Sequence, residues 1–474
     1  MNPLHKTLLF PALSLGLCAS CAQPECFTSL DEPQARVVVL TDAEIDDQCS
    51  MVRFLLNANE FDVEAIITTS SMFHWQGHHW AGDDWMDRFL SAYRKVWPNL
   101  VKHDAAYPAP DALEKVTMLG NVSAEGEMEE QTLGSRFIAD LLLDEQDARP
   151  IWFQAWGGLN TLARALKSIE EEHPDRMEAV AAKIRIYTIW EQDDSYRNYI
   201  LPVWGKYDVP TIFSDQFWCL AYSWRESLPE EVRPLFEGKW MKEYVLENHG
   251  PLCALYPNRD GNFISEGDSP SFLYNIRTGL NVMEHPEWGG WGGRYVSGGT
   301  RSYYDPAPEG ESDWTVPEGR YSPDNAWLGR HRGASRETML AYYAPIGRWA
   351  DAFQHDFAAR ADWCVKSYDE ANHAPVVCVT GEQERPAAPG KTLSLDARRS
   401  SDPDGDALSF RWWYDAAAGT GGGTPVLQDE SSARCKVSLP ADAVPGETYH
   451  VICEVTDQGE PTLTRYARVI VTIR

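Results

Sequence analysis

The chain has 474 residues, of which 43% are hydrophobic, and it carries a formal net charge of −29 at pH 7. This length suits two domains rather than one, and the hydrophobic content is sufficient for buried cores. The strong negative charge argues against nucleic acids and anionic membranes as partners, because both would repel such a surface. Neutral substrates and cations are compatible with this negative charge.

The first 22 residues have the pattern of a secretory signal. A weakly basic start precedes an apolar stretch over 8–17, and residues 18–22 resemble the end of a bacterial lipoprotein signal with Cys21 as the lipid anchor. Plain cleavage near Ala22 is the alternative. No later segment approaches the roughly 20 apolar residues of a transmembrane helix. We therefore expect an exported protein that is periplasmic, tethered to the outer membrane as a lipoprotein, or extracellular.

Strand-like and helical segments alternate between residues 34 and 365. Residues 159–166 carry apolar side chains at helical spacing. Apolar runs without polar alternation indicate strands buried on both faces, as in a parallel sheet. They occur at 37–40, 63–69, 150–156, 183–190 and 209–213. Strands separated by helices predict an α/β fold with a mostly parallel sheet covered on both faces.

Four carboxylates crowd the end of the first predicted strand, at Asp42, Glu44, Asp46 and Asp47. In open α/β sheets, ligands bind at the carboxyl ends of the strands. Carboxylates at this density repel one another unless a cation or protons offset their charge, so the segment predicts a metal site. The alternative is the amino terminus of a helix, where acidic residues interact favourably with the helix dipole.

Two predicted loops near the same sheet edge carry further candidates. His74 and its histidine neighbours lie beside Trp75, without an acid or cysteine at a spacing that supports zinc. Rings that stack on a sugar are the better interpretation, and packing among the loop aromatics is the alternative. Glu191 follows the strand predicted at 183–190, where it would either line a pocket or belong to a solvated acidic loop.

Residues 273–324 are rich in Gly, Pro, Trp and Tyr, which predicts an ordered but irregular loop region of the kind that carries binding functions. Trp288 and Trp291 in this region have two interpretations. They are either platforms for a sugar ring or members of a local core.

A second domain is predicted after a polar linker at 366–374. Alternating β-branched residues and frequent turn signals indicate an immunoglobulin-like β-sandwich over 375–474. We find no catalytic constellation in it. Cys435 and Cys453 are candidates for a bridge between neighbouring strands, since export permits disulfides. Free buried thiols are the alternative.

Three segments of the predicted α/β domain resemble one family. Residues 40–47 contain an Asp, three intervening residues and an Asp-Asp pair, which resembles the strand-end signature of the inosine-uridine nucleoside hydrolases. Residues 156–163 resemble that family's Gly-Gly motif, and 267–271 resemble its late His-Asp-Pro segment.

A narrower resemblance covers almost the whole mature chain. It is to nucleoside hydrolase-like domains fused to a carboxy-terminal sandwich, described in polysaccharide-degrading bacteria as cellulose-binding proteins. The segments that carry it are 266–274, 289–294 and 353–360. Residues 402–414 resemble the immunoglobulin-like modules of secreted bacterial carbohydrate enzymes.

The resemblance implies a three-layer fold and a Ca²⁺ ion held by Asp42, Asp47, Asp268 and the backbone carbonyl of Trp156. This set fits the preference of calcium for hard oxygen ligands. In the family's arrangement Asp42 would also act as the general base, and Asp46 would contact a sugar hydroxyl.

The chain departs from the family at positions that serve the substrate. Leu40 replaces the first Asp of the signature, His74 or its neighbour stands near the family's sugar-binding Asn, and Gly267 replaces the proton-donating His. A proton donor would have to come from elsewhere. The candidates are His74, His78, Glu191 and Glu266.

Two functions are compatible with this sequence. The leading hypothesis is a secreted, calcium-dependent hydrolase of N-glycosidic or related glycosyl bonds in a ribosyl or other carbohydrate substrate. The alternative is a non-catalytic protein that binds cellulose or another polysaccharide on the same scaffold. The predicted substrate contacts are Asp46, His74, Trp75, Glu191 and Glu266.

Overall fold

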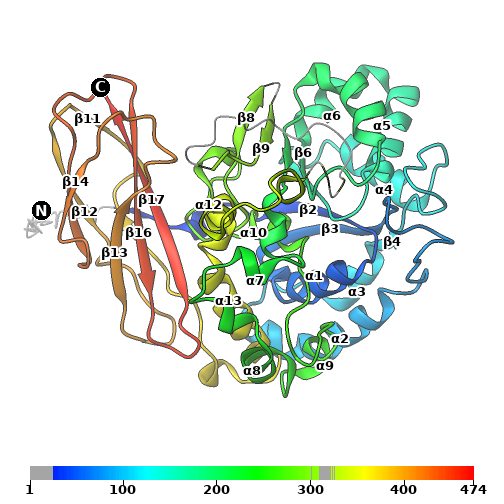
Figure 1. Ribbon diagram of the computed structural model, residues 1–474, viewed down its shortest axis with the longest axis horizontal. Helices are drawn as coiled ribbons and strands as arrows, with labels where there is room; N and C mark the ends of the chain where they lie inside the picture. Colours follow the sequence, from blue (N-terminus) through cyan, green and yellow to red (C-terminus); the bar gives the residue numbers. More distant parts are fainter. Residues whose placement is uncertain (1–24, 300, 309–321, 323, 325) are drawn as a thin grey trace, which may run out of the picture.

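The computed structural model of the chain describes residues 25–299, 301–308, 322, 324 and 326–474. The predicted signal segment with Cys21, and part of the region 273–324, lie outside the described residues. The described chain forms a larger unit with a central sheet and a smaller all-β unit beside it (Figure 1).

Eight of the described strands form the central sheet, in the order β4-β3-β2-β5-β6-β7-β9-β8. All neighbouring pairs are parallel except β8 and β9. The strands are β2 Ala35–Thr41, β3 Phe61–Thr68, β4 Thr117–Leu119, β5 Ile151–Ala155, β6 Ile184–Thr188, β7 Thr211–Phe213, β8 Val296–Gly299 and β9 Ser302–Tyr304. This arrangement confirms the predicted mostly parallel α/β fold.

Helices cover both faces of this sheet, because successive side chains of a strand point to opposite sides. Val37 and Val39 pack in a core with α1, α2, α10 and α13, whereas Val38 and Leu40 pack in another with α4, α5 and α6. The result is three layers (Figure 1). The α-helices are α1 Ile45–Leu56, α2 Asp87–His103, α3 Pro110–Lys115, α4 Leu133–Leu143, α5 Asn160–Glu172, α6 Met177–Lys183, α7 Trp224–Ser227, α8 Gly238–Met241, α9 Gly250–Cys253, α10 Ser269–Leu273, α11 Trp327–Arg330, α12 Arg336–Gly347 and α13 Ala350–Trp363.

Short helical turns of other types connect these elements. They are η1 Ser29–Asp31, η2 Ala58–Glu60, η3 Pro174–Arg176, η4 Tyr196–Trp204, η5 Gly205–Tyr207, η6 Gln216–Cys219, η7 Arg233–Phe236, η8 Lys242–Leu246, η9 Pro286–Trp288 and η10 Tyr368–Glu370. The segment η6 follows β7 at the carboxyl edge of the sheet.

The region 273–324 is less irregular than predicted, because β8 and β9 lie within it and extend the sheet beyond β7. Strands of four and three residues are too short to produce a periodic hydrophobic signal. The two tryptophans of this region also differ: Trp291 is 1% exposed and belongs to the core, whereas Trp288 is half-buried.

The smaller unit is a β-sandwich, as predicted. Within residues 375–474, four strands form one sheet in the order β11-β17-β16-β13, and three form the other in the order β12-β15-β14. Apolar side chains of both sheets fill the space between them. The strands are β11 Glu384–Ala387, β12 Thr392–Asp396, β13 Ser409–Tyr414, β14 Val426–Gln428, β15 Arg434–Ser438, β16 Thr448–Thr456 and β17 Thr464–Ile473.

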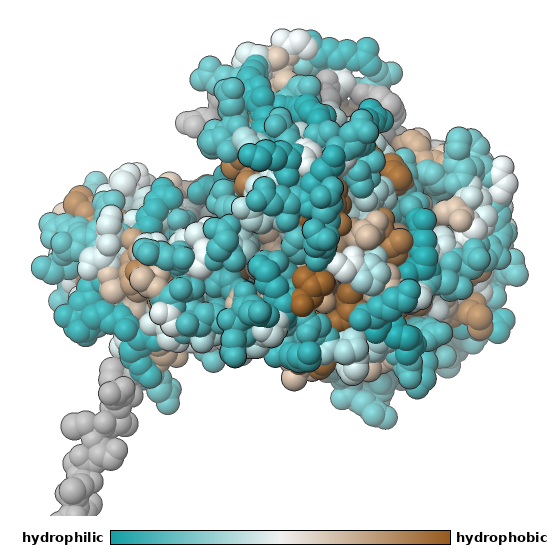
Figure 2. Space-filling view, turned by 90° about the horizontal axis from the view of Figure 1, so that it is seen from below, coloured by the Kyte–Doolittle hydropathy of each residue, from teal (hydrophilic) through white to brown (hydrophobic). Residues whose placement is uncertain are grey.

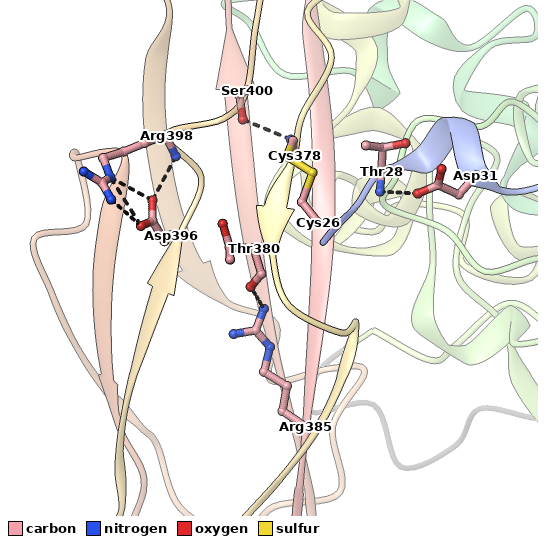
Figure 3. Close-up of a disulfide and its surroundings, with 9 residues drawn as sticks. All are labelled: Cys26, Thr28, Asp31, Cys378, Thr380, Arg385, Asp396, Arg398 and Ser400. Atoms are coloured by element: carbon pink, nitrogen blue, oxygen red, sulfur yellow. Dashed lines mark hydrogen bonds and ion pairs between the residues drawn. A yellow bond between two sulfur atoms is a disulfide. The ribbon is translucent and has the colours of Figure 1, made fainter. Parts of the chain in front are cut away.

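A disulfide joins Cys26 to Cys378 and so ties the short strand β1 Cys26–Phe27 to β10 Val379–Thr380 (Figure 3). The suggested bridge between Cys435 and Cys453 is absent from the described chain, where both are buried free thiols. Their strands, β15 and β16, belong to opposite sheets rather than being neighbours. The bridge that does form spans 352 residues of sequence.

The sandwich packs on the larger unit through β16 and β17. Ile452 and Tyr466 are part of the core that contains α1 and α13. The backbone N–H of Tyr466 donates to the carbonyl of Thr278 at 2.8 Å. Gly279 next to it has φ +84, and a Cβ there would lie 1.9 Å from the Tyr466 carbonyl oxygen. Only glycine allows this close approach of the two backbones.

The face of the molecule shown in Figure 2 is dominated by hydrophilic residues, with hydrophobic ones in small patches. This agrees with the net charge of −29.

In the described part of the chain, no helix combines the length and the apolar character needed to cross a membrane.

Candidate functional site

The acidic segment lies where β2 ends and α1 begins. Ala43 adopts φ +68, a left-handed conformation that turns the chain sharply between strand and helix. Asp46 and Asp47 fall in the first turn of α1. The Asp47 carboxylate accepts hydrogen bonds from the Thr41 hydroxyl and, at 3.1 Å, from the backbone N–H of Asp42. The segment is therefore a helix amino terminus as well as a carboxylate cluster.

Asp268, immediately before α10, joins this cluster from a distant part of the sequence. Asp46, Asp47 and Asp268 each offer a carboxylate oxygen such that these atoms lie within 4.8 Å of one another. Asp42 forms a second group of the same kind with Glu44 and His74. Asp42, Asp47 and Asp268 are each at most 2% exposed. The structure thus groups Asp47 and Asp268 with Asp46, whereas Asp42 belongs to the neighbouring group.

Burial and mutual repulsion make this cluster unfavourable without a compensating charge. Burial and the neighbouring carboxylates raise the pKa of Asp46 to about 7 and hold the pKa values of Asp47 and Asp268 well above the usual range. Among the described residues, Asp42 Oδ2, Asp46 Oδ1 and Asp268 Oδ2 are buried and accept no hydrogen bond. The group of Asp46, Asp47 and Asp268 offers only oxygen atoms, and hard divalent cations such as Ca²⁺ suit it best. The group of Asp42, Glu44 and His74 also offers a ring nitrogen.

Trp156 lies beside Asp42 at the end of β5. Its backbone N–H and that of Gly157 donate to the Leu40 carbonyl at 2.8 and 3.1 Å. A Cβ on Gly157 would lie 2.8 Å from the Asp42 Cβ. The Trp156 carbonyl accepts a hydrogen bond from the Gln192 side-chain amide, which leaves its second lone pair free for another interaction.

Two adjoining cavities open beside the carboxylates. The first, of about 170 Å³, combines carboxylates with aromatic rings, and it is lined by Glu44, Asp46, Phe73, Ile189, Gln192, Phe217, Trp218 and Tyr222. The second, of about 370 Å³, is lined by Glu44, Ile45, Phe73, His74, His78 and His79. Glu44 and Phe73 line both cavities, which therefore adjoin and together make up the hollow beside the carboxylates.

Most of the aromatic wall is not among the site residues predicted from the sequence. Phe217 and Trp218 belong to η6, and Tyr222 follows it. Tyr222 is 49% exposed and so is accessible to a ligand. These residues come just after β7, so the rule that ligands bind at the carboxyl ends of strands would have pointed to them.

His74 and Trp75 have different positions. His74 Nδ1 lies 4.0 Å from Asp42 Oδ2 and 3.8 Å from Glu44 Oε2, at the cavity wall. Burial lowers the pKa of His74, and the Asp42 carboxylate opposes this effect. Trp75 instead stacks on His78, with ring centroids 4.1 Å apart, and lines neither cavity. For Trp75 the structure therefore favours packing among the loop aromatics.

Glu191 and Glu266 do not line the hollow either. Glu191 accepts a hydrogen bond from Arg197 at 2.9 Å. Glu266 is completely buried, and its carboxylate accepts hydrogen bonds from Arg53, Tyr256 and Ser269. Glu266 is thus part of a core ion pair, with no free oxygen directed at a substrate.

Gly267, which stands where the nucleoside hydrolases have a histidine, has no room for a side chain. A Cβ there would lie 2.8 Å from Asp46 Oδ2 and 3.2 Å from the Phe217 ring. The Phe217 ring therefore takes part of the space that a side chain at position 267 would need.

Comparison with known proteins identifies the family. Residues 36–295, more than half of the chain, match the family described as "Cellulose-binding Sde182, nucleoside hydrolase-like domain". The chain belongs to this family. Residues 392–473 match "Cellulose-binding protein Sde0182, C-terminal domain", so both units have counterparts among the Sde182 proteins. Membership of this family and the disulfide both indicate a location outside the cytoplasm.

Three solved structures illustrate what the chain is similar to, and the first of them shares its fold. A nucleoside hydrolase-related hypothetical protein from Saccharophagus degradans, associated with carbohydrate metabolism, is 29% identical, with a TM-score of 0.74 over 93% of this chain and 100% of that one. A plant nucleoside hydrolase is 14% identical over 53% of this chain and 81% of that one, with a TM-score of 0.29. An inosine-uridine-preferring nucleoside hydrolase from Bacillus anthracis is also 14% identical, over 50% and 80%, with a TM-score of 0.28. No curated protein matches the chain in sequence.

Proposed function

We propose that the chain binds a neutral polysaccharide such as cellulose, holding one or a few sugar units in the hollow beside the carboxylate cluster. The observation that carries this proposal is the composition of the hollow: Phe73, Trp218 and Tyr222 line the same space as Glu44 and Asp46. Sugars expose apolar C–H faces that pack on aromatic rings, and hydroxyls that donate to carboxylates, so this combination suits them. Membership of a cellulose-binding family supports the same ligand class.

A calcium ion at the cluster is the second part of the proposal. Asp42, Asp47 and Asp268 would hold it together with the Trp156 carbonyl, and Asp46 is placed either to join them or to contact a sugar hydroxyl. The unpartnered buried oxygens of Asp42 and Asp268 support this assignment. When bound, the ion would neutralise the cluster and offer coordination positions to sugar hydroxyls or water.

The test is a binding measurement on cellulose and soluble cello-oligosaccharides, with calcium present or removed by EGTA. Tyr222→Ala and Trp218→Ala should weaken binding about tenfold, since stacking and burial of one aromatic ring contribute on the order of 1–2 kcal/mol. Tyr368→Ala is the matched control, because Tyr368 is also exposed, at 38%, but lies on η10 away from the hollow. Binding that is unaffected by both cavity variants would contradict the proposal.

Hydrolysis of a glycosyl bond is the second candidate, and one observation favours it. Asp42 Oδ2 is buried without a hydrogen-bond donor, 4.0 Å from the Nδ1 atom of His74, so a potential base and a potential acid stand side by side. Asp42 would take a proton from the attacking water, and His74 would be a candidate to donate one to the leaving group. An anionic pocket also stabilises an oxocarbenium-like transition state.

A screen of nucleosides and oligosaccharides with calcium present would test for hydrolysis. Sugar release that is abolished by EGTA and by Asp42→Ala would establish it. Cellulose binding by the parent protein without turnover of any glycoside would exclude it.

For localisation, we infer export with either a lipid anchor at Cys21 or simple cleavage near Ala22. The sequence of residues 18–22 supports the first form. Incorporation of labelled palmitate that is lost in Cys21→Ser would distinguish the two forms.

A further inference from the structure

A separate cavity of about 380 Å³ lies between the two units of the fold. Its walls include Trp288 and Arg294 from the region before β8, Arg348 and Trp349 between α12 and α13, and Asp415 from the sandwich. It shares no lining residue with the hollow at the carboxylate cluster. Trp288 lines this cavity, which accounts for its half-buried side chain. Trp291 does not line it.

Two guanidinium groups in this wall, those of Arg294 and Arg348, form no ion pair with any carboxylate of the described residues. The Arg348 guanidinium lies over the rings of Trp349 and Trp413, 4.5 and 5.1 Å from their centroids. Arg294 Nη1 donates to the Ala417 carbonyl at 3.4 Å. Within the described part of the chain, no carboxylate lies within ion-pair distance of Arg294 or Arg348.

The one carboxylate that lines the cavity is already engaged. Asp415 accepts a hydrogen bond from the buried Arg468 at 3.1 Å. Burial lowers the pKa of Arg294 despite the attraction of Asp415, and Arg348 lowers it further, so the two wall guanidiniums are close enough to repel each other. Arg294 and Arg348 therefore share the cavity wall with a single carboxylate, which already pairs with Arg468, in a chain whose overall net charge is −29. A local positive excess of this kind attracts an anion.

We propose that this cavity binds the uronic acid unit of an acidic oligosaccharide. Guanidinium groups form paired, charge-assisted hydrogen bonds with carboxylates, which would supply the missing counter-charge. Trp288 and Pro345 in the same wall offer apolar surface to the C–H faces of a sugar ring. The proposal goes beyond the neutral-sugar site and does not depend on it.

Titration calorimetry with trigalacturonic acid and its trimethyl ester tests the proposal, because the two probes share a backbone and differ in charge. The acid should bind at least ten times more tightly than the ester, and its affinity should fall as salt is added. Arg348→Gln and Arg294→Gln should each lower the affinity for the acid at least tenfold, and Arg348→Lys should lower it less. Arg225→Gln is the matched control: its guanidinium also lies over an indole, 4.1 Å from the Trp224 ring centroid, but outside the cavity.

The proposal would be overturned by equal affinity for acid and ester, by no measurable binding of the acid, or by unchanged affinity in both glutamine variants. Inorganic phosphate that competes as well as the uronate would instead indicate a general anion site, and would also overturn it. Thermal unfolding of each variant verifies that the variant is folded. EGTA should leave this titration unchanged while it weakens cellulose binding, so failure here is distinguishable from failure of the proposed function.

Discussion

At the scale of single residues, Gly157 and Gly158 determine how closely the strand ends can approach at the site. A Cβ on Gly158 would lie 2.2 Å from Asp193 Oδ2 and 2.3 Å from the Ser70 carbonyl oxygen. A Cβ on Gly157 would instead meet the side chain of Asp42, 2.8 Å from its Cβ. Neither glycine has a positive φ, so both are required for space rather than for backbone conformation.

Gly157→Ala should therefore weaken calcium binding by displacing Asp42. We expect the apparent calcium affinity to fall about tenfold or more, which would reduce the calcium-dependent rise in Tm. Thermal denaturation over a calcium series measures this. Gly422→Ala is the control, because the nearest atom to its added Cβ is Glu447 Oε1 at 3.7 Å. If the two alanine variants respond equally to calcium, Asp42 does not hold the ion.

At the scale of elements, a buried ion pair connects α1 to the segment before α10 and to α13. Arg53 of α1 contacts Glu266 at 2.5 Å and also donates to the Phe353 carbonyl and the Gln354 side chain at 3.0 and 2.8 Å. The Phe357 ring lies 3.9 Å from the guanidinium carbon. Because α1 and Asp268 both contribute to the carboxylate cluster, this pair holds two parts of the site together.

Glu266→Gln should destabilise the fold, because it leaves the Arg53 charge buried without its counter-charge. The expected loss is about 3–5 kcal/mol, measured by chemical denaturation. Glu129→Gln is the control, since the Glu129 carboxylate pairs with Lys167 at 79% exposure and should contribute little. If Glu266→Gln leaves the stability unchanged but abolishes carbohydrate binding, Glu266 is a substrate contact rather than a partner of Arg53.

The same elements show what can be predicted from sequence. The strand around Val38 can be predicted from sequence because its residues are apolar on both faces. The acidic residues of the site can be predicted with it, because they follow this strand directly in the sequence. The short strands β8 and β9 have no such signal. The role of Glu266 depends on Arg53, 213 residues away, and no local pattern encodes a pairing over that distance. The family resemblance, in contrast, combines several distant segments, and the comparisons confirm it.

At the scale of the whole molecule, polar contacts reinforce the packing of the sandwich on the α/β unit. Asp356 of α13 accepts hydrogen bonds from Arg465 of β17 and from Arg360, each at 2.7 Å. Burial disfavours the Asp356 carboxylate, but the two guanidiniums outweigh this effect and hold its pKa at about 2. An ordinary aspartate titrates near 3.9, about two units higher.

This depressed pKa predicts how the stability of the two-unit assembly depends on pH. Since the folded pKa lies below the unfolded one, the ionised Asp356 stabilises the protein above about pH 4, and this contribution is lost as the pH falls toward 2. Asp356→Asn should therefore lower Tm at pH 7, corresponding to about 2–3 kcal/mol, and the gap to the parent protein should narrow below about pH 4. Asp351→Asn, on the exposed side of α13, should show no such gap. A gap that persists unchanged at pH 3 would mean that the ionised Asp356 does not stabilise the contact between the units.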